Sequence, residues 1–203
     1  MDFQFLTRSR PIQALTYPAY LDLMTAQAEA AAPADDAEAA QRIEYTQLNL
    51  HRSQRIARTW QPSGELASLL QIVTEPEQWL VLTEPWCGDS AQCLPCVAVM
   101  AERQPNIGLH ILPRDANLDI MDQFLTDGKR SIPVVVMFDA AGREAGRWGP
   151  RPAAAQAEFD AAKAAGLDKP AILERLHLWY GRDRGRAVDA EFCSLLKRRM
   201  GGA

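Results

Sequence analysis

Residues 79–90 read WLVLTEPWCGDS, and this stretch decides the fold. Its first five residues are a short apolar run, which is typical of a strand buried on both faces. Beyond Cys87, apolar residues recur at helical spacing over 94–101, which predicts one buried helix face. The stretch therefore predicts a strand, a turn and a helix that begins at a cysteine.

The chain after this stretch continues to alternate strands and helices. Apolar runs predict strands over 109–112 and 133–138, and 143–148 follows a turn as the hairpin partner of the second run. Helical spacing predicts helices over 118–125 and 153–165, the latter ending at Gly166. Residues 79–166 are thus predicted to form one β-α-β-α-β-β-α unit.

Helical patterns flank this unit on both sides. Residues 15–78 predict three helices, and two amphipathic helices follow Pro170. In the second and third N-terminal helices, the residues expected to face a core are Ile43, Leu48, Ile56, Trp60, Leu66, Leu69 and Leu70. We therefore divide the chain into a helical N-terminal extension (1–78), a central domain (79–166) and C-terminal helices packed on it (167–203).

The composition is that of an ordinary globular protein. Of 203 residues, 47% are hydrophobic and 24% are charged, and the formal net charge of −4 provides no basic surface for nucleic acid. The N-terminal segment lacks the apolar region of a secretory signal, and no apolar run approaches the roughly 20 residues of a membrane helix. We therefore expect a cytoplasmic protein that binds neither nucleic acid nor membrane.

Three short motifs relate the central unit to a known superfamily. Trp86-Cys87-Gly88 follows the first strand, Pro95 lies inside the next helix, and Ser131-Ile132-Pro133 precedes the third strand. This arrangement resembles the thioredoxin superfamily. The resemblance implies an α/β thioredoxin fold, a central four-stranded mixed sheet flanked by helices, here with helical N- and C-terminal extensions. With the segment 148–152, WGPRP, the motifs look like those of a bacterial group of thioredoxin-like proteins with added helices.

Cys87 is the candidate catalytic nucleophile. A cysteine at the start of a helix faces unpaired N–H groups and the positive end of the dipole, which favour thiolate over thiol. Asp89 acts in the opposite direction, because a nearby carboxylate disfavours a second negative charge. The direction of the net pKa shift therefore stays open. Cys87 is expected to be the most exposed and most reactive of the four thiols, and the alternative interpretation is a small buried residue after a strand.

The resemblance also implies a substrate groove beside this thiol. If Pro133 is cis, as in the family, the backbone of Ile132 lies next to the thiol and can pair with an extended substrate strand. Trp86, Gly88 and Asp89 are expected to line the rest of the groove. Without the resemblance, an Ile-Pro pair is more simply an ordinary trans proline that opens an edge strand.

Two residues depart from the thioredoxin pattern. Ser90 stands where the usual dithiol motif has its second cysteine, so a disulfide from Cys87 to residue 90 is impossible. Ser90 either donates a hydrogen bond to the thiolate or only caps the helix. Val81 replaces the buried acid that thioredoxins carry on this strand, which argues against efficient thioredoxin-type reduction.

Cys93 and Cys96 form a second Cys-x-x-Cys and are secondary redox candidates. Along a regular helix Cys93 lies roughly 9 Å from Cys87, whereas disulfide Cα separations rarely exceed about 7 Å. Core packing explains Cys93 and Cys96 slightly better than redox chemistry does, and Cys193, in an apolar helix, is expected to be inert. Metal-binding cysteines usually lie on turns, so we expect no metal site, and we expect no cofactor.

Arg114 and Arg130 are candidate contacts for an anionic partner. Arg114 follows the second strand at its carboxyl end, where open α/β sheets place their ligands, and Arg130 lies just before the Ile132-Pro133 pair. Pairing of these arginines with carboxylates such as Asp115 is an equally good interpretation. The three histidines have no motif context and are expected to be structural.

Two functions follow from these residues. In the first, the protein is a thiol-disulfide redox protein whose Cys87 forms a mixed disulfide with a disulfide-containing protein or a low-molecular-weight thiol. That disulfide is then resolved by a low-molecular-weight thiol, by Cys93 after rearrangement, or by a partner reductase. In the second, the protein is a non-catalytic module that binds a peptide or protein in the cis-proline groove. Retention of Trp86 and Cys87 favours the first function.

Overall fold

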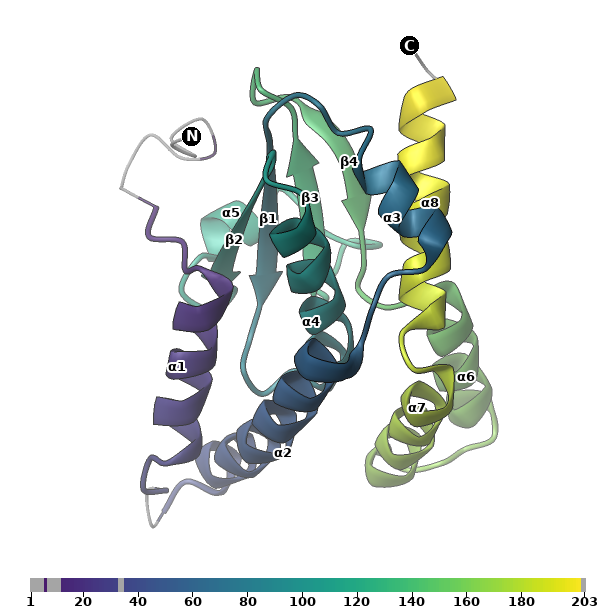
Figure 1. The fold of residues 1–203 in the computed structure, drawn as a ribbon. Coiled ribbons are helices and arrows are strands. Elements are labelled where there is room, and N and C mark those ends of the chain that lie inside the picture. The colour runs from purple at the N-terminus through teal and green to yellow at the C-terminus, as the bar shows by residue number, and fades with distance from the viewer. Residues whose placement is uncertain (1–5, 7–11, 33–34, 202–203) are drawn as a thin grey trace.

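The computed structural model describes residue 6, residues 12–32 and residues 35–201. In these residues four strands form a central sheet with helices around it (Figure 1). In chain order the elements are α1 (Tyr17–Ala28), α2 (Ala37–Thr59), α3 (Gly64–Leu70), β1 (Glu77–Thr83), α4 (Gly88–Arg103), β2 (Ile107–Pro113), α5 (Leu118–Met121), β3 (Val134–Phe138), β4 (Glu144–Trp148), α6 (Ala153–Ala164), α7 (Lys169–Asp183) and α8 (Arg186–Gly201). The predicted fold class, a four-stranded mixed sheet flanked by helices with further helices at both ends, is confirmed.

β1 lies inside the sheet because both of its edges are paired. The strand order is β2-β1-β3-β4, with β1 parallel to β2, antiparallel to β3, and β3 antiparallel to β4. In this register Val81 lies opposite Ile111 of β2 and Val135 of β3. Every residue of β1 except Gln78 is buried, as its continuous apolar run predicts.

The alternation of side chains along β1 divides the core into two layers. Trp79 and Val81 belong to the larger layer, to which every helix except α5 contributes. Leu80 and Leu82 belong to the smaller layer, which includes the residues of α5. Figure 1 shows α4 on one face of the sheet and α5 behind it on the other. Because successive strand residues point to opposite faces, this one strand anchors both layers.

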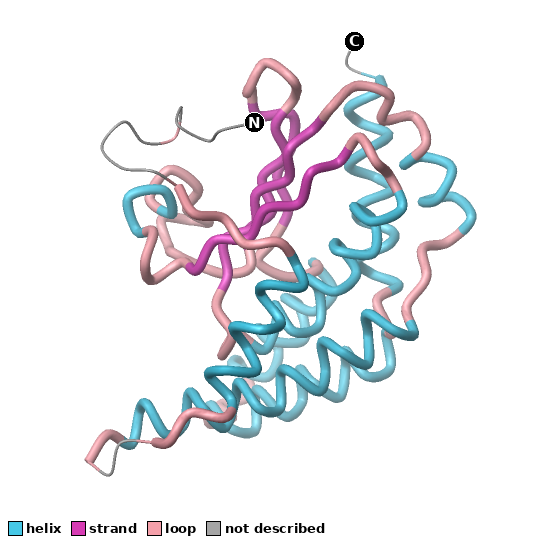
Figure 2. The backbone as a smooth tube through the Cα atoms, turned by 60° about the vertical axis from the view of Figure 1, so that its left-hand side comes forward, coloured by secondary structure: helices cyan, strands magenta, loops and turns pink. Residues whose placement is uncertain are grey.

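α1 and α2 form a helical hairpin that projects away from the sheet (Figure 2). The side chains of Thr16 and Asp36 accept hydrogen bonds from backbone N–H groups in the first turn of each helix, at 3.3 and 2.9 Å. These caps satisfy donors that have no partner inside a helix. The hairpin contacts the body of the protein at the start of α1 and along α2, which packs against α4.

The buried face of α2 differs from the prediction. Ile56 is buried as expected, but Leu48 is 46% exposed. Polar residues lie on the buried face instead, namely Thr46, Asn49 and Ser53. The Asn49 amide donates to the carbonyl oxygen of Pro85, 3.0 Å away in the loop before Cys87. The prediction for Leu48 is wrong because this helix face is selected by hydrogen bonding, which a hydrophobicity pattern does not reveal.

The helix predicted over 118–125 is also shorter than expected. Only α5 is helical, and the N–H groups of Gln123 and Phe124 then bond to carbonyls three residues back, which tightens the chain into turns. Thr126 and Lys129 next exchange two backbone hydrogen bonds of 2.9 Å across a tight turn. Phe124 is buried. The apolar spacing therefore predicted its burial correctly, but turns rather than a helix place it in the core.

α8 packs against the sheet through one aromatic side chain. Phe192 is fully buried, and its ring centroid lies 5.7 Å from that of Trp79 in β1 and 5.4 Å from that of Trp148 in β4. Arg199 of α8 adds an ion pair with Glu77 at the start of β1. α8 also lies beside α3 at the β4 side of the sheet (Figure 1). The C-terminal helix is therefore part of the main core.

We predict that Phe192→Ala lowers the free energy of unfolding by about 3–5 kcal/mol, because it empties the space between two buried indoles. The measurement is urea denaturation followed by circular dichroism. Leu178→Ala is the control: Leu178 is 54% exposed on α7, and its truncation is expected to change stability by about 0.5 kcal/mol or less. Equal effects of the two substitutions would contradict a core role for α8.

Candidate functional site

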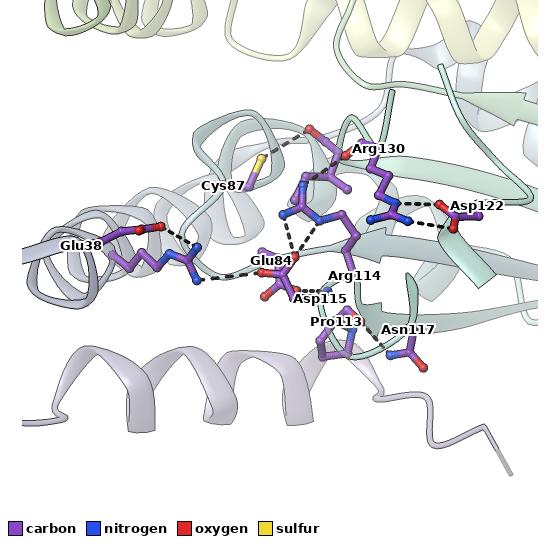
Figure 3. A network of polar contacts seen from close by, with 11 residues as sticks. Glu38, Glu84, Cys87, Pro113, Arg114, Asp115, Asn117, Asp122 and Arg130 are labelled. Carbon is purple, nitrogen blue, oxygen red and sulfur yellow. Dashed lines mark hydrogen bonds and ion pairs between the residues drawn. The ribbon is translucent and has the colours of Figure 1, made fainter. Parts of the chain in front are cut away.

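Cys87 is the N-cap residue of α4, so the helix begins where the sequence predicts. Its N–H donates to the carbonyl oxygen of Glu84 at 3.0 Å, and its carbonyl accepts from the N–H of Ala91 at 3.1 Å. Its thiol donates to the carbonyl oxygen of Ile132 at 3.4 Å (Figure 3). Only 8% of Cys87 is exposed, so the expected opening to solvent is narrow, although it is wider than for the other three cysteines.

Burial dominates the electrostatics of this thiol. Loss of solvation, followed by the charge of Asp89, raises the pKa of Cys87 to about 11. The hydroxyl of Ser90 and the N–H groups of Asp89 and Ser90 favour the thiolate but do not outweigh burial. The net shift that the sequence left open is therefore upward.

Ser90 and Trp86 are held by their neighbours. Ser90 is buried, and its hydroxyl oxygen accepts a hydrogen bond from the hydroxyl of Thr83. The indole of Trp86 contacts the guanidinium groups of Arg42 and Arg114, whose central carbons lie 5.4 and 5.1 Å from the ring centroid. These cation–π contacts fix the indole next to the cysteine.

The segment before β3 adopts the geometry that the resemblance implied. The Ile132–Pro133 peptide bond is cis, and so is Gly149–Pro150, which was not predicted. Gly149 has φ 123°, and a Cβ there would lie 2.2 Å from the carbonyl oxygen of Pro133. Only glycine fits both conditions. The chain at Gly149 is therefore held against the cis-proline segment.

Asp89 is buried in a network that reaches the C-terminal half of the chain. One carboxylate oxygen accepts from Arg151 at 2.7 and 3.1 Å, and the other accepts from the hydroxyl of Tyr180 at 2.6 Å. The thiol of Cys93 in turn donates to the Tyr180 oxygen at 3.7 Å. Burial raises the pKa of Asp89, while the charge of Arg151 and these hydrogen bonds oppose the rise.

His177 of α7 lies over Gly88. A Cβ at position 88 would lie 2.8 Å from His177 Cε1, so a larger residue there would displace the imidazole. Burial, and to a smaller degree the charge of Arg52, lowers the pKa of His177 to about 4. The ring is therefore neutral at pH 7 and covers this flank of the site without adding charge.

The other three cysteines are buried free thiols. Cys93 and Cys96 lie inside α4 and Cys193 inside α8, consistent with core packing. Burial raises the pKa of all three, and of Cys93 well above its usual range. The secondary redox role of Cys93 and Cys96 stays a prediction. Within the described ranges, no three His, Cys, Asp or Glu side chains gather as a metal ion would require.

Arg114 and Arg130 both pair with carboxylates. Arg114 donates to Asp115 at 2.7 and 2.9 Å and to the carbonyl oxygen of Arg130 at 3.1 Å (Figure 3). Arg130 makes a two-point contact with Asp122, at 2.6 and 2.8 Å. Ion pairing was one of the two interpretations of these residues. Their contact with an anionic partner stays a prediction.

Three residues at the site were given no role from the sequence. Arg151 belongs to the 148–152 motif, which was noted in the sequence as part of the family resemblance. Nothing in that motif indicated that Arg151 pairs with Asp89. Tyr180 lies in the first of the two amphipathic helices predicted after Pro170, and His177 is one of the three histidines expected to be structural. Both reach the site only because α7 packs against the start of α4.

Comparison with known proteins agrees with this arrangement. Residues 37–163, more than half of the chain, match the Thioredoxin_9 family, described as Thioredoxin. The chain belongs to this family. Its mixed sheet and surrounding helices are thus a thioredoxin-like fold with added N- and C-terminal helices. Curated proteins give no match.

Two solved structures resemble this thioredoxin-family chain over nearly all its length. One is a protein of unknown function, PA1234 from Pseudomonas aeruginosa, with 22% identity, a TM-score of 0.57, and coverage of 93% of this chain and 99% of that one. The other is an HIV epitope-scaffold, with 24% identity, a TM-score of 0.53 and the same coverage. At these identities both comparisons support the fold alone.

We predict that alkylation of Cys87 by iodoacetamide accelerates about tenfold per pH unit from pH 7 to 10, because its pKa is raised to about 11 and the reactive thiolate grows with pH up to that value. Peptide mass spectrometry is expected to find Cys87 labelled before Cys93, Cys96 and Cys193. Cys87→Ser supplies the control. A plateau near pH 8.5, or earlier labelling of Cys93 or Cys96, would contradict the assignment.

Proposed function

We propose that this member of the thioredoxin superfamily is a thiol-disulfide redox protein in which Cys87 forms a mixed disulfide with its substrate. The observation that carries the proposal is the contact of 3.4 Å between the Cys87 thiol and the backbone of Ile132 at the cis proline. A nucleophile and a peptide edge lie side by side, which is what attack on a disulfide in an extended segment requires.

The backbone of Ile132 supports binding of an extended substrate. Ile132 precedes β3, and in the described part of the chain its N–H makes no hydrogen bond. Among the described residues, its carbonyl accepts only from the Cys87 thiol. A substrate strand pairing with these two groups would bring its own disulfide to the sulfur of Cys87.

The chemical step exchanges one S–S bond for another. The Cys87 thiolate attacks one sulfur of the substrate disulfide, and the new bond forms as the old one breaks. The second substrate sulfur leaves as a thiolate and takes a proton from water. One substrate sulfur is then bound to Cys87, and the other is reduced.

Resolution of the mixed disulfide is proposed to use an external thiol. Ser90 occupies the usual position of the resolving cysteine, and Cys93 is fully buried against Tyr180. A low-molecular-weight thiol or a partner reductase would therefore attack the Cys87 sulfur and release the substrate sulfur as a thiolate. A second external thiol would then attack the donor sulfur now bound to Cys87 and release the Cys87 thiolate, so that the two donor thiols end as a disulfide. Such a monothiol cycle needs no disulfide within the chain.

The second candidate function is a non-catalytic binding module. It is favoured by one observation, the burial of Cys87, which raises the pKa of its thiol to about 11 and so keeps it largely protonated at pH 7. In that case the Ile132 edge would hold a peptide or protein without exchange chemistry. The two functions differ in whether Cys87 is needed.

We further propose that this activity belongs to the cytoplasm, where thiols stay reduced. All four cysteines are free. No helix among residues 12–32 and 35–201 combines the length and apolar character needed to cross a membrane.

We predict that glutathione disulfide adds one glutathione to the native protein at Cys87, and that Cys87→Ser abolishes this adduct. Intact-protein mass spectrometry after brief exposure at pH 8 is the measurement. Cys193→Ser is the matched control and is expected to keep the adduct, because Cys193 is buried in α8. An adduct that survives Cys87→Ser would move the chemistry to another thiol, and no adduct at all would favour the binding module.

We also predict that insulin-disulfide reduction is slow in the natural protein and accelerates in Ser90→Cys. The substitution supplies a second thiol one helical turn from Cys87 and so permits intramolecular resolution. Turbidity of precipitating insulin B chain reports the rate. If Ser90→Cys does not accelerate insulin reduction, the missing cysteine is not the limiting defect. Val81 and the residues of the substrate groove would then be substituted next.

A further inference from the structure

Asp89 places a buried carboxylate two residues after the candidate nucleophile. The Asp89 side chain is 9% exposed and that of its partner Arg151 is 16% exposed, so the pair lies largely outside solvent. A buried charge without a partner is costly, and an opposite charge with good hydrogen bonds offsets that cost. The two contacts from Arg151 provide such a partner, at 2.7 and 3.1 Å.

Arg151 is itself held before it meets Asp89. Its guanidinium carbon lies 4.5 Å from the ring centroid of Phe159, and its third nitrogen donates to Gln156 at 3.2 Å, both on α6. The chain two residues earlier, at Gly149, is held against the cis-proline segment. The contacts with α6 and the contact of Gly149 with the cis-proline segment thus fix the position of the Arg151 guanidinium.

No other cation neutralises Asp89 in the part of the chain that the structure describes. On α7, Tyr180, which contacts Asp89, is a neutral phenol with a strongly raised pKa. His177, which covers Gly88, is neutral because burial lowers its pKa to about 4. Cys93, on the same helix α4, is also neutral at pH 7. Arg151 is therefore the compensating charge.

The groups facing Cys87 from other elements are also neutral or acidic. Tyr20 of α1 is a buried phenol whose pKa is strongly raised by loss of solvation. Glu84, in the loop before the cysteine, has a raised pKa because of burial. Asp89 is the charged group that opposes the Cys87 thiolate. The cation that compensates the charge of Asp89 therefore affects how readily Cys87 ionises.

We propose that Arg151 is a positioning residue for the chemistry of Cys87: it holds and compensates the buried Asp89 carboxylate, and so limits how strongly that carboxylate opposes the thiolate. This inference rests on the proposed function of Cys87. Arg151 touches neither the thiol nor the substrate edge and acts only through Asp89. The hydroxyl of Tyr180 completes the arrangement by binding the other carboxylate oxygen.

The sign of the effect follows from the order of titration. Without Arg151, an ionised Asp89 has no compensating cation, and its full negative charge opposes the Cys87 thiolate. Cys87 then titrates beside an uncompensated negative charge, so its pKa rises further. Removal of the carboxylate has the opposite effect and lowers the pKa of Cys87.

The experiment measures the iodoacetamide alkylation rate of Cys87 against pH in the full-length chain, with peptide mass spectrometry to assign the site. Arg151→Gln is expected to lower the rate at pH 10, where carboxyl ionisation is most complete, by about tenfold, the change that one pKa unit produces. Asp89→Asn is expected to raise it. The double variant Asp89→Asn/Arg151→Gln is expected to react faster than Arg151→Gln, and Arg151→Lys to recover part of the natural rate.

Arg175→Gln is the matched control, because Arg175 forms an exposed ion pair with Glu158 at 2.9 Å and lies away from Asp89. Its pH profile is expected to match that of the natural chain. Simple loosening of the structure would expose Cys87 and speed its alkylation at every pH, so a slower reaction in Arg151→Gln distinguishes charge compensation from damage. If Arg151→Gln does not fold, Asp89→Asn still tests the effect of Asp89 on Cys87, and an unchanged profile in that variant removes the route through which Arg151 would act.

An unchanged or acid-shifted profile in Arg151→Gln, or an unchanged profile in Asp89→Asn, would overturn the inference. Failure of the proposed function has a different signature. In that case the pH profiles shift as expected, but glutathione disulfide forms no adduct at Cys87. Adduct formation together with identical profiles in all variants would retain the function and remove the role of Arg151.

Discussion

The burial of β1 on both faces is the constraint on which the rest of the structure depends. A strand paired on both edges, with side chains in two core layers, has almost no freedom of position. The helices are then arranged by what must cover Trp79 and Val81 on one face and Leu80 and Leu82 on the other. Because Cys87 follows the carboxyl end of this strand after a short loop, the same constraint fixes where the thiol lies.

Two opposing effects set the pKa of Cys87: its position at the start of a helix and its low-dielectric surroundings. The N–H groups at the start of α4 favour a thiolate, but burial and Asp89 oppose it more strongly. The C-terminal helices enter this balance directly, since Tyr180 of α7 contacts Asp89 and His177 covers Gly88. The added helices are therefore not only a shell around a thioredoxin-like unit, because they supply part of the environment of its cysteine.

The parts that the sequence predicted well are those set by local rules. An apolar run predicted β1, and the position of Cys87 predicted the start of α4. The motif at 131–133 predicted the cis proline through a family resemblance. Local rules failed where another interaction replaced hydrophobic burial. α2 buries Asn49 because of a hydrogen bond to Pro85, and the end of α5 is shaped by turns.

The partners of Asp89 could not be predicted for a different reason. Arg151 and Tyr180 lie far from Asp89 in the chain, and no periodicity or spacing connects them. Only the packing of α6 and α7 beside α4 brings them together. The raised pKa of Cys87 follows from its burial in the smaller core layer and from the charge of Asp89, whereas a solvent-exposed helix start would shift it in the opposite direction.

The contact between Gly88 and His177 links two positions across the chain. The space for a side chain at 88 is taken by the imidazole, so the two residues share one volume. An alanine at position 88 would therefore require the His177 imidazole to turn away. The motif next to the cysteine and α7 are thus coupled through packing, although 89 positions separate the two residues.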